Sequence, residues 1–118
     1  MKTPRRVFGD RGELLAEREL RKKGLQILER QYQTKGGEID LIAKDGNEIV
    51  FVEVKTRQTH TFGYPEEAVT NRKIRALMRA VEFYLREHHL EETPWRMDVV
   101  AIEWGDPPHV EIIEGIGG

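Results

Sequence analysis

The chain has 118 residues, enough for one domain with a single hydrophobic core. Its 19 Lys and Arg nearly balance 21 Asp and Glu, so the net charge of −2 excludes a polycation, although a local basic face could still bind nucleic acid. The absence of cysteine excludes disulfide scaffolds, thiolate zinc sites and cysteine nucleophiles. No apolar run approaches the roughly 20 residues of a membrane span, and the basic start has no apolar segment after it. We therefore expect a soluble cytoplasmic protein.

A helix and a strand are predicted first along the chain. Apolar residues at near-helical spacing predict a helix over Asp10–Lys23. Asp10 and Glu13 have the spacing of a capping box, and Gly24 is suited to end the helix. The strand follows at Leu25–Tyr32.

A β-hairpin is the strongest local prediction. Its strands are Glu38–Ala43 and Glu48–Lys55, joined by a turn at Asp45-Gly46. A two-residue loop there would pair Asp40 with Phe51. Alternation then places the odd-numbered residues of the second strand on the face of Asp40.

The second half of the chain adds a helix and two strands. Apolar residues at i, i+3, i+4 and i+7 predict an amphipathic helix over Asn71–His88. Strands are predicted at Trp95–Ile102 and Val110–Ile113. The order αβββαββ, with no linker or repeat, predicts one α/β domain over residues 1–118, with a mixed central sheet of about four or five strands flanked by helices.

Three charged residues interrupt the apolar hairpin strands. Asp40, Glu53 and Lys55 share one face in the predicted register, with Glu53 diagonal to Asp40 at roughly 7–8 Å between Cα atoms. Two carboxylates this close repel, and a hard divalent cation such as Mg²⁺ would relieve the repulsion and supply an activated water. Lys55 could orient that water or stabilise charge on a phosphoryl oxygen, which suits phosphodiester hydrolysis. Alternatively, Glu53 and Lys55 form an edge-strand ion pair and Asp40 is a solvated turn residue.

Longer motifs carry a resemblance to a known family. They are Gly37–Ala43 (GEIDLIA), Val50–Arg57 (VFVEVKTR) and Phe62–Val69 (FGYPEEAV), together with Gly12-Glu13 and Arg96–Val100. In these segments, which span nearly the whole chain, the sequence resembles the YraN-like uncharacterised bacterial family. That family is similar to the PD-(D/E)xK nuclease superfamily, especially archaeal Holliday-junction resolvases. The resemblance implies a restriction-endonuclease-like αβββαβ core.

The resemblance also implies a site. The metal-binding aspartate of the superfamily falls on Asp40, and the glutamate and lysine of its E-x-K motif fall on Glu53 and Lys55. The resolvase branch carries a glutamate on its first helix, which falls on Glu13. The Val54 carbonyl is expected to help Asp40, Glu53 and Glu13 hold Mg²⁺ or Mn²⁺.

Glu13 has competing interpretations. It lies eleven residues before Gly24, as the resolvase glutamate does before a helix-ending glycine, and Glu17 is the less favoured substitute. Alternatively, Glu13 is a capping-box residue at the start of its helix. The chain departs from the family at Gln31 and Gln33, where Asn and Arg are common, so contacts in that region are in doubt.

Basic residues around this centre could contact phosphates. We expect this role for Lys35, Arg57, Arg72, Lys73 and Arg75. The polar loop over residues 56–64 could act as a flap over substrate. Alternatively, the arginines of the second helix are a solvated face.

The function that these expectations imply is a metal-dependent endonuclease that hydrolyses DNA phosphodiester bonds, with branched DNA as one candidate substrate. The resolvase-like resemblance further implies a homodimer with two active sites. The alternative is a non-catalytic nucleic-acid-binding module or a partner-docking protein of the same fold.

Overall fold

The computed structural model describes residues 4–58 and 70–116, and the motif at Phe62–Val69 and most of the expected flap lie outside them. The elements follow the expected order αβββαββ. They are α1 (Pro4–Lys22), β1 (Gln26–Gln33), β2 (Glu38–Asp45), β3 (Glu48–Arg57), α2 (Asn71–Glu87), β4 (Trp95–Glu103) and β5 (His109–Ile113). The fold is α/β, and its first six elements match a restriction-endonuclease-like αβββαβ core.

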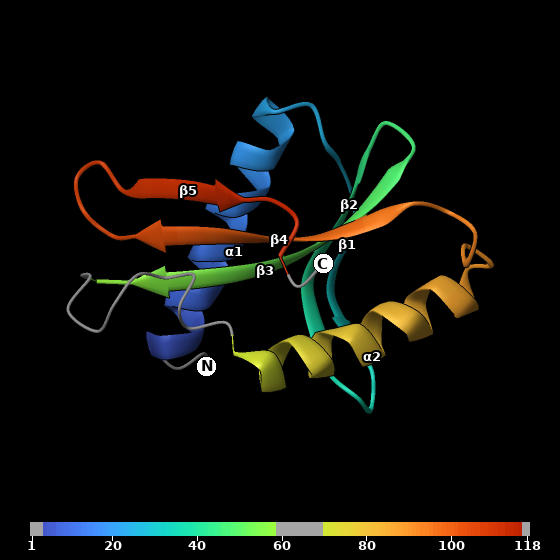
Figure 1. Ribbon diagram of the computed structural model, residues 1–118. Coiled ribbons are helices and arrows are strands. Elements are labelled where there is room, and N and C mark those ends of the chain that lie inside the picture. The colour runs from blue at the N-terminus through green and yellow to red at the C-terminus, as the bar shows by residue number, and fades with distance from the viewer. Residues whose placement is uncertain (1–3, 59–69, 117–118) are drawn as a thin grey trace.

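One mixed sheet of five strands, in the order β1-β2-β3-β4-β5, forms the centre (Figure 1). Neighbouring strands are antiparallel except β3 and β4, which are parallel. A parallel pair needs a crossover, and the segment that contains α2 provides it. The sheet architecture expected from the sequence is confirmed.

The two helices cover opposite faces of the sheet. In Figure 1, α1 passes behind β3 and β4, and α2 runs along the other side. Ala16 and Leu20 of α1 pack on one hydrophobic cluster, while Leu77 and Val81 of α2 pack on the other. No helix within residues 4–58 and 70–116 is both long and apolar enough to cross a membrane.

The first helix begins six residues earlier than the sequence analysis predicts. α1 starts at Pro4, whose fixed φ suits the first helical position, rather than at Asp10. Asp10 and Glu13 therefore lie in the helix interior, and the capping-box interpretation of Glu13 is wrong. The helix ends as expected before Gly24, which adopts a φ of +94°.

The hairpin register also differs from the prediction. Asp45 pairs with Glu48 and Ile42 pairs with Phe51, so the turn residues are Gly46-Asn47 and not Asp45-Gly46. Gly46 has a φ of +61° at the first central position, as a type II′ turn requires. The shift is by two residues, which leaves the faces unchanged.

An ion-pair network with one buried carboxylate, Asp98, fixes the hairpin end of the sheet. Asp98 is 1% exposed and accepts hydrogen bonds from Arg96 Nε at 3.1 and 3.2 Å and from the Gly115 amide at 3.0 Å. Arg96 Nη1 also donates to Asp45 at 3.1 Å and to Glu48 at 2.6 Å. One arginine thus ties β4 to the β2–β3 hairpin, and Asp98 holds the segment after β5.

Candidate active site

Asp40 and Glu53 meet near the start of β2, where the pairing of β2 with β3 ends and the first turn of α2 lies close by. The paired register of β2 and β3 ends with Leu41 opposite Val52, and one step further along both strands Asp40 lies opposite Glu53. Beyond that pair the Val54 amide donates to Asp40 Oδ2 at 2.8 Å. The two carboxylates are therefore closer in register than the diagonal placement that the sequence predicts.

Asp40 is held in an unfavourable environment for a charge. Burial, the nearby Glu53 carboxylate and the more distant charges of Glu13 and Glu38 raise the pKa of Asp40 to about 7, against the opposing effect of the Val54 hydrogen bond. A carboxyl group with a pKa near neutrality is typical of functional sites, although structural clusters also produce such shifts. The alternative interpretation is right that Glu53 and Lys55 form an ion pair, but β3 is an inner strand of the sheet. Asp40 is a half-buried residue within β2 and not a solvated turn residue.

Glu53 lies between two ammonium groups. It is 5% exposed, and its Oε1 lies 3.4 Å from Lys55 Nζ and 3.2 Å from Lys73 Nζ. Lys55 is the lysine that the sequence predicts here, whereas Lys73 is predicted only to contact phosphates. The Thr70 hydroxyl accepts from the Lys73 amide and caps α2, which fixes Lys73 in the first helical turn above Glu53.

Glu13 faces the same region from α1 and has its own partner. Gln31 Nε2 donates to Glu13 Oε2 at 2.9 Å, and Gln31 adopts a φ of +50°, unusual for a residue other than glycine. Gln31 is one of the two residues at which the resemblance leads us to expect a departure from the family, and nothing in its sequence context indicates this contact. The backbone of β1 is turned so that an amide meets the carboxylate of Glu13.

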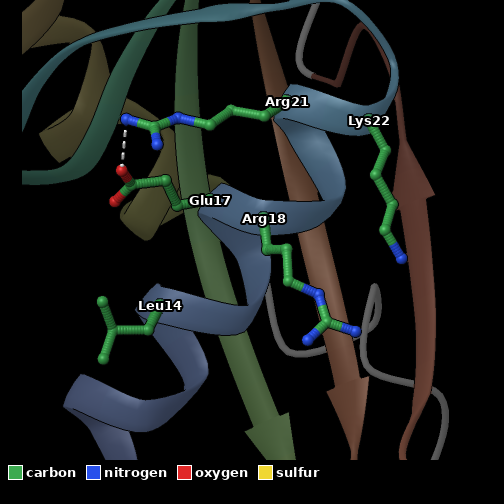
Figure 2. A pocket seen from close by; sticks show the side chains of 5 residues that line it. All are labelled: Leu14, Glu17, Arg18, Arg21 and Lys22. Atoms are coloured by element: carbon green, nitrogen blue, oxygen red, sulfur yellow. Dashed lines mark ion pairs between the residues drawn. The ribbon is translucent and has the colours of Figure 1, made fainter.

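Glu17, the less favoured substitute for Glu13, is engaged elsewhere. It pairs with Arg21 at 2.8 Å, as Figure 2 shows, and accepts two hydrogen bonds from Arg30 of β1. The hydrogen bonds from Arg30 lower the pKa of Glu17 despite its burial. Glu17 therefore joins α1 to β1.

The donor set fits a hard divalent cation. Mg²⁺ is usually held by one or two protein carboxylates and keeps water and substrate oxygens as its other ligands. Asp40 and Glu53 supply two carboxylates, and the Val54 backbone lies beside Asp40. Among residues 4–58 and 70–116 no three His, Asp or Glu side chains form a ready cluster for a metal, so a third ligand from Glu13 stays a prediction.

The expected phosphate-binding residues differ in exposure. Lys35, Arg72 and Arg75 are exposed, whereas Arg57 is half-buried at the end of β3. Lys73 reaches into the acidic site. Three of the five residues are thus presented to a ligand in solvent.

Comparison with known proteins supports the resemblance. The model of the uncharacterised protein family UPF0102 matches residues 12–102, a range that contains Glu13, Asp40, Glu53 and Lys55. A UPF0102 protein of Carboxydothermus hydrogenoformans is 45% identical over 86% of each chain. UPF0102 proteins of Caldicellulosiruptor saccharolyticus and Moorella thermoacetica are 46% and 44% identical over 83% and 98% of each chain.

Proposed function

We propose that this chain, which belongs to the uncharacterised protein family UPF0102, is a divalent-metal-dependent endonuclease acting on DNA phosphodiester bonds. One observation carries the proposal: Asp40 and Glu53 converge at one site, where burial and then repulsion by Glu53 raise the pKa of Asp40 to about 7. Repulsion between two carboxylates lowers the stability of the folded protein. A bound divalent cation would offset this repulsion, so a cation-dependent activity explains why both carboxylates are present.

Asp40 and Glu53 would hold Mg²⁺ or Mn²⁺, with the Val54 carbonyl and Glu13 as further ligands. Such an ion lowers the pKa of water and neutralises charge on a phosphodiester. The Val54 amide fixes the orientation of Asp40 through its 2.8 Å hydrogen bond. Lys55 places an ammonium group on the same face, where it can orient the attacking water and stabilise charge that develops on a phosphoryl oxygen.

The partners follow from the same proposal. Lys35, Arg57, Arg72 and Arg75 would bind DNA phosphates, with branched DNA among the candidate substrates. A junction offers two strands for cleavage, so we propose a homodimer with two sites. We propose that it acts in the cytoplasm. Light scattering at tens of micromolar, with and without branched DNA, tests the dimer, and a monomer under both conditions would contradict it.

Metal titration by calorimetry beside cleavage of labelled branched, nicked, single-stranded and duplex DNA tests the activity. Asp40→Asn removes an anionic ligand and should weaken metal binding, whereas Lys55→Ala should keep the metal and lower turnover by roughly 10²- to 10³-fold. Glu91→Gln, an exposed change outside the site, is the matched control. The proposal fails if wild type binds no divalent ion even with DNA present, or if Asp40→Asn cleaves as fast as wild type.

A non-catalytic nucleic-acid-binding module is the second candidate. It is favoured by the two lysines on Glu53, because they already compensate that carboxylate without a metal. This candidate predicts DNA binding that is the same with Mg²⁺ and with EDTA, and no cleavage of any substrate in the panel.

A further inference from the structure

The outward face of α2 carries a stripe of arginines. Its members, which we call the arginine stripe, are Arg72, Arg75, Arg79 and Arg86. All four are exposed, and none lies within ion-pair distance of a carboxylate in residues 4–58 or 70–116. α2 contains five basic and two acidic residues in a chain whose net charge is −2. The helix therefore carries an excess of three positive charges, the difference between its five basic and two acidic residues.

An exposed phenylalanine interrupts the stripe. Phe83 is 50% exposed, and helical spacing places it beside Arg79, four residues before, and Arg86, three residues after. The apolar residues that join α2 to the sheet, such as Leu77 and Val81, are on the buried side. Packing of the helix thus gives no reason for a large aromatic side chain on its outer face.

The stripe begins at the candidate active site. Arg72 adjoins Lys73, whose ammonium lies 3.2 Å from Glu53, and Phe83 follows eleven residues later, about 16 Å along the helix axis. The turn between β1 and β2 packs against Arg79 of the arginine stripe, because a Cβ on Gly36 would lie 3.1 Å from Arg79 Cβ. That turn adds the exposed Lys35 to the same side of the molecule.

The chemistry of this face selects its occupant. In a symmetric dimer formed by α2 against itself, four arginines would face four arginines, which is unfavourable. A lipid surface would need an apolar helix face, and that of α2 is buried in the core. Cations that follow a backbone, together with an aromatic ring on which a base can stack, are typical of single-stranded nucleic-acid binding. A base inside a duplex is already stacked and cannot reach Phe83.

We infer that the arginine stripe and Phe83 bind a single-stranded segment of the substrate, with its phosphates on the arginines and an unstacked base on the Phe83 ring. The inference rests on the proposed function and specifies its substrate class as DNA with a single-stranded arm beside the cleaved bond. It also assigns Arg79, Phe83 and Arg86 a role that the sequence analysis does not give them.

Fluorescence anisotropy in EDTA separates this inference from the proposed activity, because it measures DNA binding while EDTA removes the divalent cations needed for cleavage. The probes are a labelled 20-base-pair blunt duplex and the same duplex with a ten-nucleotide single-stranded tail. Phe83→Ala should weaken binding of the tailed DNA by about 5- to 100-fold, as removal of one base–aromatic stack does, and should leave duplex binding unchanged. Phe83→Trp should restore it.

Matched controls come from the outer face of α1, where Leu14 is 66% exposed and Arg18 lies one turn further on (Figure 2). Leu14→Ala and Arg18→Gln should bind both probes as wild type does, whereas Arg75→Gln should reduce the salt dependence of tailed-DNA binding by about 0.7 in the log–log slope. The inference is overturned if Phe83→Ala behaves as Leu14→Ala does, or if it weakens duplex and tailed DNA equally. Tailed-DNA binding that depends on Phe83, in a protein that cleaves none of the panel with Mg²⁺, would support the inference and contradict the nuclease.

Discussion

Replacement of Asp40 by asparagine should stabilise the metal-free protein at alkaline pH. The folded chain keeps the Asp40 proton up to about pH 7, while the unfolded chain releases it near 3.8. The free energy of unfolding of the wild type therefore falls as pH rises from about 4 to 7, because in this window the folded state binds more protons. Roughly three pKa units at 1.36 kcal/mol each set an upper bound of about 4 kcal/mol for the loss. Asparagine mimics the protonated carboxyl group and can still accept the Val54 hydrogen bond.

Urea unfolding in EDTA at pH 4.5 and 8.5 measures the effect. The advantage of Asp40→Asn over wild type should grow by up to about 3 kcal/mol between these pH values, while Glu91→Gln shows no such change. Addition of Mg²⁺ at pH 8.5 should stabilise the wild type and have little effect on the variant. The electrostatic reasoning is refuted if Asp40→Asn is the less stable protein at pH 8.5, or if the difference does not depend on pH.

Two further changes test the packing around the site and the sheet. Gly37→Ala places a Cβ 2.7 Å from the Ala76 carbonyl oxygen and should lower the free energy of unfolding by about 1–3 kcal/mol in thermal or urea unfolding. The control Gly105→Ala places a Cβ at an ordinary 3.5 Å from its neighbour and should cost much less. Equal losses for the two variants would argue against this close approach. Asp98→Asn leaves the Arg96 charge without its buried partner and should lower the free energy of unfolding by about 3 kcal/mol. The Gly115 amide should also exchange its hydrogen faster. An unchanged unfolding midpoint would show that Asp98 does not hold the network.

Side-chain periodicity was sufficient to predict the fold and the core of the site. Alternation along the hairpin strands placed Asp40, Glu53 and Lys55 on one face, and an error of two residues in the register could not change that face. The register itself depends on which residue takes the positive φ of the turn. Asp45-Gly46 and Gly46-Asn47 are both acceptable turn sequences, so local preference alone did not decide between them.

The contacts that the sequence did not predict join elements far apart in the chain. Lys73 enters the site because α2 begins above β3. Its place four residues before the buried Leu77 puts it nearer the sheet than the exposed Arg72 and Arg75, a periodic signal that the charge of Lys73 obscured. The Gln31 contact with Glu13 depends on a backbone conformation that glutamine rarely adopts. Strand periodicity contains no information on that conformation.

The close packing of α1 against β3 restricts which residues relatives of this chain can have at positions 12 and 56. A Cβ on Gly12 would lie 2.5 Å from the Thr56 Cγ2 methyl group, so a larger residue at position 12 requires that methyl group to move. Each of these positions adjoins a candidate catalytic residue, Glu13 on the helix and Lys55 on the strand. A larger residue at position 12 should therefore occur together with a smaller one at position 56. An aligned set of family sequences would reveal this as covariation between the two positions, and Gly12→Ala should be tolerated better in a Thr56→Ser background than alone.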